Sequence, residues 1–290
     1  MDIVDAQIHL FMTMDDDEAV RVMDSLGIRS ALIDEAWDFG DNDPSKTTGG
    51  AGGELMPSWP VGGGVHRPVA PGAIAASMRR PDRFGYFLRI NARDPDLDFV
   101  MRSVAASPGG RGFRLDVRAP DDLAAYEEGH HDAPFRIAER LGLPMFLFSV
   151  GRAPAFERYI RAHPSLPIIF DHCGLPQSAG DFDRLLDLAR YPNTYVKWSH
   201  APLMFHASRF PFPEVRPHLA RALDAFGRER IMWASDFTAI DFAAHVHGRP
   251  ESTYSWAEAL YYMRCNPELS EDDQEWVLGR TARTVLNWAG

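Results

Sequence analysis

The segment PIIFDHCG (residues 167–174) is a short apolar run that ends in a carboxylate, an imidazole and a glycine. A continuous apolar run of this length is typical of a strand covered on both faces, as in a parallel sheet. Asp171 and His172 follow the run directly, and side chains of these types are costly to bury without partners. The segment therefore predicts a buried strand whose carboxyl end carries functional groups.

Seven further apolar runs have the same character, at residues 3–10, 30–34, 84–91, 112–117, 144–150, 194–200 and 231–237. Between most of them, apolar residues recur every three or four positions, which predicts helices; the clearest stretches are 134–141, 155–163, 181–191 and 213–226. Acidic residues 15–18 before a stop at Gly27 predict another helix, and Ser270 predicts the start of a C-terminal helix. Eight strands alternating with helices predict an α/β fold, a (β/α)8 TIM barrel rather than an open doubly wound sheet.

Two regions interrupt the alternation of strands and helices. Residues 41–72 follow the second strand, contain two glycine-rich runs and show no hydrophobic periodicity. Loops of this length are commonly lids or binding loops, so we expect this one to lie over the catalytic face. Residues 241–253 follow the eighth strand in the same way. We find no repeat or linker, so we expect one domain over residues 1–290.

The composition argues against some classes of binding partner. The 290 residues include 30 Lys and Arg against 41 Asp and Glu, a net charge of -11, which argues against nucleic acids and anionic membranes as partners. A small anionic substrate is still compatible with this charge, because a few buried arginines can dominate the local field. With two cysteines, Cys173 and Cys265, no signal sequence and no membrane-length apolar stretch, we expect a cytoplasmic protein.

Polar residues end most of the predicted strands, where barrel enzymes place their chemistry. They are Gln7 and His9, Arg89 and Asn91, Arg114 and Asp116, Asp171 and His172, Lys197, Ser199 and His200, and Ser235 and Asp236. Each has a structural explanation when taken alone; Arg114, for example, could simply pair with Asp116. Together they bring several ionisable groups to one mouth, and such a cluster is more often functional than structural.

Five segments resemble motifs of the amidohydrolase superfamily and occur in the same order. DAQIHL (5–10) is similar to the D-x-H-x-H-L opening strand, FDHCGLP (170–176) to D-H-x-G-x-P, and YVKWS (195–199) to V-K-x-S. IMWASDF (231–237) is similar to M-W-G-S-D-W, and VLGRTAR (277–283) to the L-G-x-N-A-x-R closing helix. The resemblance is to the amidohydrolase-related (amidohydrolase 2) branch, which includes 2-pyrone-4,6-dicarboxylate lactonases, sugar-lactone hydrolases and decarboxylases of the aminocarboxymuconate-semialdehyde type.

This resemblance implies a metal site, but the sequence departs from the pattern at two positions. Gln7 replaces the first histidine of the pair, and FLFS (146–149) ends the fifth strand in Ser149 without a ligand. An amide is a poor zinc ligand, although His9, His172 and Asp236 remain as three candidate ligands. One divalent ion, zinc or manganese, and no metal at all are therefore equally admissible.

The resemblance leads us to expect a hydrolase that opens a small carboxylated lactone or a related acyl compound. Asp236 would act as general base, while His172, His9 and the Gln7 amide polarise the carbonyl group. Lys197 would assist or pair with Asp236.

Substrate binding is expected from a second set of residues. Arg114 and Arg89 suit a substrate carboxylate, because guanidinium groups bind carboxylates through two parallel hydrogen bonds. The remaining candidates are Ser149, His200 and Arg67, the last near the end of the glycine-rich loop.

Two alternatives stay open: a metal-dependent decarboxylase of the same superfamily, and an inactive barrel used for binding. Related proteins are often dimers, so a homodimer is also open, although no interface is recognisable in the sequence.

Overall fold

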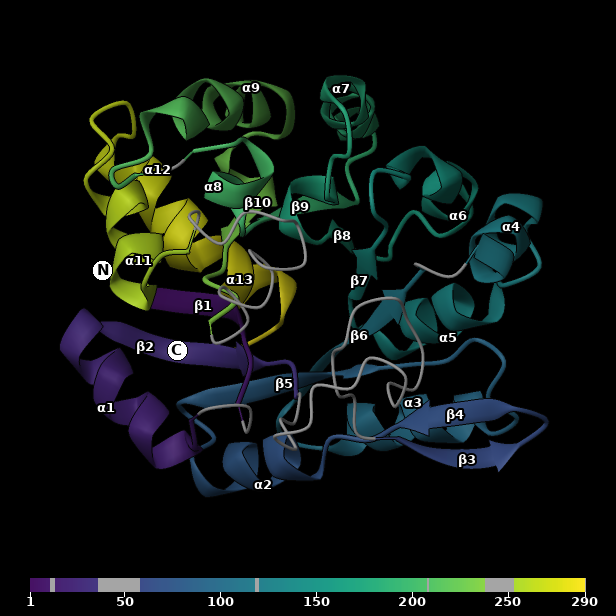
Figure 1. The fold of residues 1–290 in the computed structure, drawn as a ribbon. Coiled ribbons are helices and arrows are strands. Elements are labelled where there is room, and N and C mark those ends of the chain that lie inside the picture. Colours follow the sequence, from purple (N-terminus) through teal and green to yellow (C-terminus); the bar gives the residue numbers. More distant parts are fainter. Residues whose placement is uncertain (11–13, 36–57, 118–119, 208, 238–252, 290) are drawn as a thin grey trace.

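Eight parallel strands form one sheet that curls into a nearly closed barrel (Figure 1). The computed structural model describes residues 1–290 except 11–13, 36–57, 118–119, 208, 238–252 and 290. In sheet order the strands are β1 (Ile3–Ile8), β2 (Ile28–Ile33), β5 (Phe84–Arg89), β6 (Gly110–Asp116), β7 (Met145–Phe148), β8 (Ile168–Phe170), β9 (Thr194–Trp198) and β10 (Ile231–Trp233). This order follows the sequence and confirms the predicted barrel, and each strand lies within or overlaps one of the predicted apolar runs.

The barrel closes between β1 and the residues that follow β10. The Asp236 backbone N–H donates to the Gln7 carbonyl oxygen over 2.9 Å, and Ile8 and Phe237 form a parallel bridge. β1 also changes register between Asp5 and Ile8. The closing hydrogen bonds therefore draw Gln7 and Asp236 together, although 228 positions separate them in the sequence.

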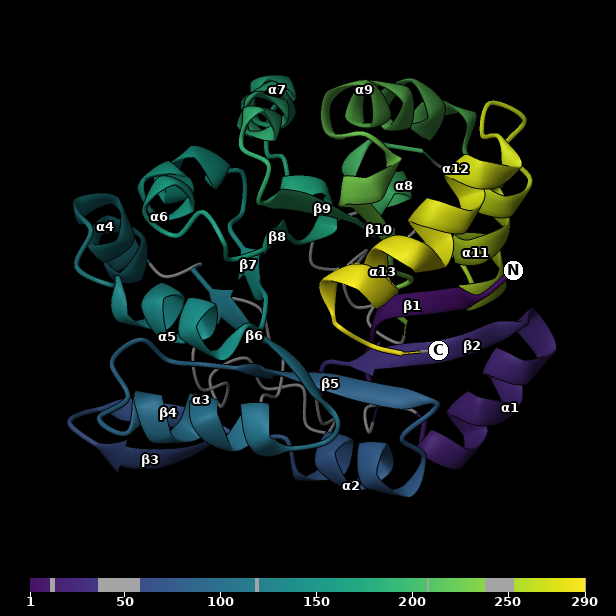
Figure 2. The same ribbon diagram turned by 180° about the vertical axis from the view of Figure 1, so that it is seen from behind.

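Helices surround the barrel on its outer side, as Figures 1 and 2 show. They are α1 (Asp16–Leu26), α2 (Pro71–Arg79), α3 (Leu97–Ala106), α4 (Pro120–Glu128), α5 (Ala133–Leu141), α6 (Glu157–Ala162), α7 (Ala179–Asp187), α8 (Ala201–Met204), α9 (Arg216–Phe226), α11 (Trp256–Arg264), α12 (Glu271–Glu275) and α13 (Thr281–Val285). Among the described residues, no helix has both the length and the apolar character needed to cross a membrane.

Helix ends follow the predicted signals. The Asp15 side chain accepts a hydrogen bond from the Glu18 backbone N–H over 2.8 Å, and Gly27 ends α1 with a φ of 74°. Ser270 caps the C-terminal helix, which runs through α12, a π-helical turn and α13. Side-chain oxygens satisfy backbone N–H groups at a helix start, and glycine takes the left-handed conformation at its end without strain.

The long segment after β2 is partly regular. Residues 58–68 form an antiparallel hairpin of β3 (Ser58–Gly62) and β4 (Val65–Pro68), and α2 begins at Pro71. The three consecutive glycines 62–64 make the hairpin turn, all with positive φ. This order was not evident in the sequence, because the hairpin is short and largely exposed and so shows no apolar alternation. Residues 41–57 and 241–252 of the two predicted loops lie outside the described residues.

The inside of the barrel changes from apolar to charged along the strands. Alternate residues of a strand face the same side, so an inward apolar residue is followed two positions later by an inward charged one. The pairs are Leu32 and Asp34, Phe87 and Arg89, Ile169 and Asp171, Tyr195 and Lys197, and Ala234 and Asp236. Ala282, Leu286 and Trp288 from the C-terminal region pack onto the apolar layer. This layer supports the charged layer at the carboxyl ends of the strands.

Candidate active site

Three buried carboxylates and three buried cations lie together in this charged layer. The carboxylates belong to Asp34, Asp171 and Asp236, and the cations to Arg89, Arg114 and Lys197; each of the six residues is at most 6 % exposed. Their formal charges cancel. Burying charge is tolerated when ions are paired and hydrogen-bonded, and the contacts within the layer meet that condition.

Asp34 holds both arginines. Arg89 donates to both of its oxygens, from Nε over 2.8 Å and from Nη2 over 2.6 Å, and Arg114 Nη1 donates to the same carboxylate. Burial acts to raise the pKa of Asp34, but Arg89 and Arg114 outweigh it and hold this pKa at about 2. Asp34 is therefore ionised throughout the physiological range and compensates the two arginines.

Asp171 joins Arg114 to Lys197. Arg114 Nε lies 2.6 Å from one Asp171 oxygen, and Lys197 Nζ lies 2.6 Å from the other. The ammonium group also lies 4.6 Å from the ring centre of Phe146, a cation–π distance. Burial lowers the pKa of Lys197, and Asp171 opposes this change. Arg114 thus pairs with Asp34 and Asp171, besides the Asp116 that the sequence offered as a structural partner.

Gln7 connects Lys197 to Asp236. Lys197 donates to Gln7 Oε1, and Gln7 Nε2 donates to Asp236 Oδ1 and lies 3.2 Å from His9 Nε2. On the other side, His200 Nε2 donates to Asp236 Oδ2. Burial alone would raise the pKa of Asp236, but the surrounding imidazoles outweigh it and hold this pKa well below its ordinary value. Asp236 is therefore an ionised carboxylate surrounded by N–H donors.

His172 is neutral and its proton lies on Nδ1. Arg114 Nη2 lies 3.2 Å from Nε2, and because a guanidinium group only donates, Nε2 must accept. Nδ1 then donates to Ser199 Oγ over 2.8 Å. Burial lowers the pKa of His172 well below 6.5, and Asp236 opposes the shift without cancelling it.

Some buried polar atoms near these strand ends have no hydrogen-bond partner in the described part of the chain, and two of them matter for the site. They are Ser149 Oγ, which follows β7, and His200 Nδ1, which follows β9. Buried polar atoms are nearly always hydrogen-bonded in folded proteins. These two atoms therefore call for a water molecule or a ligand as partner.

A divalent ion held by His9, His172 and Asp236 does not fit this arrangement. His172 Nε2 already accepts from Arg114, and both Asp236 oxygens accept from protein N–H groups. Side-chain atoms of His172, His200 and Asp236 lie within 4.8 Å of one another, close enough for a metal site. An added charge of two units would nevertheless upset the charge balance of the six groups and would face the Arg114 guanidinium. We therefore derive no step through a metal.

Eight of the predicted site residues belong to this one contact network: Gln7, His9, Arg89, Arg114, His172, Lys197, His200 and Asp236. Arg67 lies apart on β4 and pairs with Asp94 and Asp96. Cys173 follows His172 directly, but it is fully buried and burial raises the pKa of its thiol, so it does not have the character of a nucleophile.

Asp34, which holds two cations of the network, was not among the residues predicted for the site, and Asp171 and Ser199 were predicted at strand ends without an assigned role. Asp34 directly follows β2, so the criterion of polar residues at strand ends applied to it as well. The sequence also contains two neighbouring histidines, His245 and His247, which lie outside the described residues.

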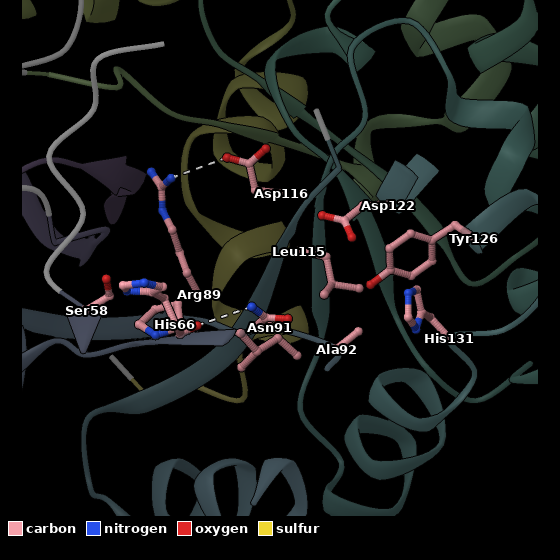
Figure 3. Close-up of a pocket in the computed structure, with 12 residues that line it drawn as sticks. Ser58, His66, Arg89, Asn91, Ala92, Leu115, Asp116, Asp122, Tyr126 and His131 are labelled. Atoms are coloured by element: carbon pink, nitrogen blue, oxygen red, sulfur yellow. Dashed lines mark hydrogen bonds and ion pairs between the residues drawn. The ribbon is translucent and has the colours of Figure 1, made fainter. Parts of the chain in front are cut away.

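A cavity of about 140 Å³ adjoins the network between the β3–β4 hairpin, the carboxyl ends of β5 and β6, and α4 (Figure 3). Arg89 lines it, and its Nη1 lies 3.7 Å from Asp116, which lines it from the neighbouring strand β6. Since the same guanidinium group holds Asp34, the wall of the cavity is also part of the buried network.

Comparisons with known proteins agree with this architecture. L-fucono-1,5-lactonase of Burkholderia ambifaria is 28% identical over 207 residues, which is 67% of either chain. An amidohydrolase from Burkholderia multivorans with bound zinc superposes with a TM-score of 0.73 at 14% identity over 100% of both chains. A protein described as a putative 2-pyrone-4,6-dicarboxylic acid hydrolase from Pseudomonas putida superposes with a TM-score of 0.66. Its identity is 18%, and the alignment covers 100% of this chain and 98% of that one.

A decarboxylase shares the fold as well. 2,6-Dihydroxybenzoate decarboxylase from Rhizobium gives a TM-score of 0.64 at 14% identity over 100% of both chains. At such low identities these structures establish only a common fold. The sequence model of the amidohydrolase family, however, matches residues 66–288 of this chain, which is more than three quarters of its length. The protein therefore belongs to the amidohydrolase family.

Proposed function

We propose that the protein hydrolyses a small cyclic ester, a lactone, at the carboxyl end of the barrel. The observation that carries this proposal is the ionised Asp236, held by Gln7, His9 and His200 beside the Ser149 hydroxyl, which has no hydrogen-bond partner within the described residues. The similarity to L-fucono-1,5-lactonase supports the same reaction class.

Asp236 serves as the base that activates water. As a water oxygen adds to the lactone carbonyl carbon, its proton passes to Asp236 Oδ2, which His200 contacts. The ring C–O bond then breaks, and the departing ring oxygen takes this proton to become a hydroxyl group. One water is consumed and one hydroxy acid is formed. The lowered pKa of Asp236 makes it a weak base towards water and favours return of the proton to the leaving oxygen.

The carbonyl oxygen gains negative charge during this step and needs N–H or O–H donors. Gln7 Nε2, which carries a second hydrogen besides the one given to Asp236, and the Ser149 hydroxyl are the candidates in the described structure. His9 Nε2 could donate, as expected from the sequence, only by turning its N–H away from Asp236. Fixed donors of this kind are worth about 10²–10³ in rate each. His172 could donate as expected from the sequence only with its proton on Nε2, which requires it to leave Arg114.

The decarboxylase alternative has less support. A substrate carboxylate needs a cation, and Arg89 and Arg114 are engaged by Asp34 and Asp171. An inactive barrel is also a weaker explanation, because a scaffold has no need of buried polar atoms such as Ser149 Oγ and His200 Nδ1, which find no partner among the residues that the structure describes.

A panel assay tests the proposal. Purified protein is given neutral and carboxylated lactones, with acid release followed at constant pH, and aromatic carboxylic acids, with CO₂ release measured. We expect acid release from at least one lactone, saturable in substrate and abolished in Asp236→Asn. CO₂ release without lactone opening would establish the decarboxylase instead, and neither activity would favour the inactive barrel.

A further inference from the structure

Asp5 is a fully buried carboxylate that the proposed reaction does not use. It lies on β1 between Val4 and Ala6, which belong to the apolar layer inside the barrel, so its own side chain faces the outer side. There it meets α11, which lies beside β1 (Figures 1 and 2), and the Trp256 indole N–H donates to Asp5 Oδ2 over 2.8 Å. Asp5 is therefore out of reach of a substrate in the mouth of the barrel.

The other oxygen of Asp5 joins the two segments that carry Gln7 and Asp236. Asp5 Oδ1 accepts from the Ser235 backbone N–H over 2.9 Å and from the Gln7 backbone N–H over 3.3 Å. Ser235 directly precedes Asp236 in the sequence. A buried N–H group that loses its acceptor is costly, and hydrogen bonds to a carboxylate are stronger than those to a neutral oxygen. One carboxylate thus holds β1, the end of β10 and α11 together.

Asp236 has a left-handed backbone conformation, with a φ of 58°. Residues other than glycine adopt this conformation infrequently, and it persists where the surrounding contacts impose it. Ser235 provides such contacts on both sides, because Asp5 holds its N–H and its hydroxyl accepts from the Phe237 N–H over 3.0 Å. The Phe237 ring in turn stacks on Trp256, with 5.0 Å between the ring centres. Both neighbours of Asp236 are therefore linked to Asp5, directly or through Trp256.

This turn determines where the Asp236 carboxylate lies. It allows the chain to bond to β1 on both sides of the side chain: the Asp236 N–H donates to the Gln7 carbonyl oxygen over 2.9 Å, and the His9 N–H donates to the Phe237 carbonyl oxygen over 2.5 Å. The carboxylate is thereby placed between Gln7 Nε2 and His200 Nε2. Rotation of the turn would carry it away from both donors.

We propose that Asp5 is a positioning residue for the reaction: by holding the turn at residues 235–237 against β1 and α11, it directs the Asp236 carboxylate at the attacking water. The inference rests on the proposed lactone hydrolysis, since it gives a part in that reaction to a residue that touches neither water nor lactone. A displacement of about 1 Å at a reacting group costs about 10² in rate. Loss of Asp5 should therefore slow the chemical step and leave substrate binding nearly unchanged.

Two substitutions of Asp5 test this role. Asp5→Ala removes the acceptor of all three N–H groups, so we expect kcat on the best lactone to fall by about 10², with KM within about twofold of wild type. Asp5→Asn keeps one acceptor oxygen; it should fold even where Asp5→Ala does not, and kcat should fall by about 10-fold. Asp16→Asn is the matched control, because Asp16 is a buried carboxylate on α1 that pairs with Arg79 and does not touch the turn. Its kcat should equal that of wild type.

A double-mutant cycle separates positioning from a general loss of stability. In the Asp236→Asn background, Asp5→Asn should change kcat by less than about twofold, because the carboxylate that Asp5 positions is gone. A loss there as large as in the wild-type background would mean that Asp5 acts on the whole fold and would overturn the inference. Wild-type kcat in correctly folded Asp5→Asn would overturn it as well.

Hydrogen–deuterium exchange tests the turn without any measurement of activity. The backbone amides of residues 235–237 should exchange at least about 10-fold faster in Asp5→Asn than in wild type or Asp16→Asn, because their hydrogen bonds depend on Asp5. Unchanged exchange would contradict the proposed role. Faster exchange in a protein that opens no lactone would uphold the positioning of Asp236 and reject the proposed reaction.

Discussion

Lys197 determines which way the Gln7 amide points. Its ammonium group donates to Gln7 Oε1, and an ammonium group has no acceptor, so the oxygen and not the nitrogen must face it. The amide nitrogen is therefore directed at Asp236. A glutamine at this position thus presents N–H groups to the carboxylate, whereas a metal ligand has to present a lone pair to the ion.

Removing this donor should slow the reaction. Gln7→Met keeps a side chain of similar length but offers no N–H to Asp236 or to the developing oxyanion. We expect kcat for lactone hydrolysis to fall by about 10²–10³ with little change in KM. Gln274→Met, on α12 in the C-terminal helix, is the matched control. Wild-type kcat in Gln7→Met would show that the amide has no part in the reaction.

Loss of Lys197 should destabilise the protein. Lys197→Met leaves Asp171 buried with Arg114 as its one remaining cation, and breaking a buried pair costs about 3–5 kcal/mol. Adding Asp171→Asn removes the uncompensated charge, so the double variant should be more stable than Lys197→Met alone. Urea denaturation gives the free energies of unfolding. Equal stability of wild type and Lys197→Met would contradict the charge balance described here.

Metal content should be low and without consequence for activity. Because the buried cluster is already neutral, we expect substoichiometric zinc and manganese by mass spectrometry after dialysis, and full lactone hydrolysis in the presence of a chelator. Gln7→His, which restores an imidazole pair with His9, should raise the zinc affinity. One tightly bound ion per wild-type chain, with activity lost on its removal, would refute this prediction.

The contribution of Asp5 to the free energy of unfolding should decrease as the pH rises. Burial raises the pKa of Asp5 to about 6, although Ser235 and Trp256 donate hydrogen bonds to it. The native state then binds this proton more tightly than the unfolded state, whose carboxyl pKa is about 3.9. Stability from this group is complete below about pH 4 and falls by about 3 kcal/mol as the pH passes 6.

The variant Asp5→Asn isolates this contribution. The difference in free energy of unfolding between wild type and Asp5→Asn should decrease between about pH 4 and pH 6, whereas a constant difference would mean that Asp5 does not titrate in this range. The opposite trend is expected from Asp34, whose lowered pKa of about 2 gives stability that is lost as the pH falls through that value.

The barrel could be predicted from the sequence because its signals are local. Each strand is a short apolar run, and residues such as Asp171 and Asp236 mark where the strands end. Alternation of side chains then places the polar residues on the inner face without further information.

Which carboxylate each buried cation pairs with could not be predicted in this way. Arg114 has Asp116 two positions away, yet it pairs with Asp34 and Asp171 on other strands. Such pairs depend on the strand neighbours and on the inward direction of each side chain at the barrel mouth. For the same reason, the sequence did not reveal that both arginines would be compensated before any substrate arrives.

The rate of lactone hydrolysis by Asp236→Asn tests the central claim most directly. The asparagine keeps the shape of the side chain but cannot take a proton from water. With the native fold verified by circular dichroism, we expect kcat to fall by about 10²–10⁴ on the best lactone of the panel. A correctly folded Asp236→Asn that hydrolyses this lactone at the wild-type rate would contradict the account.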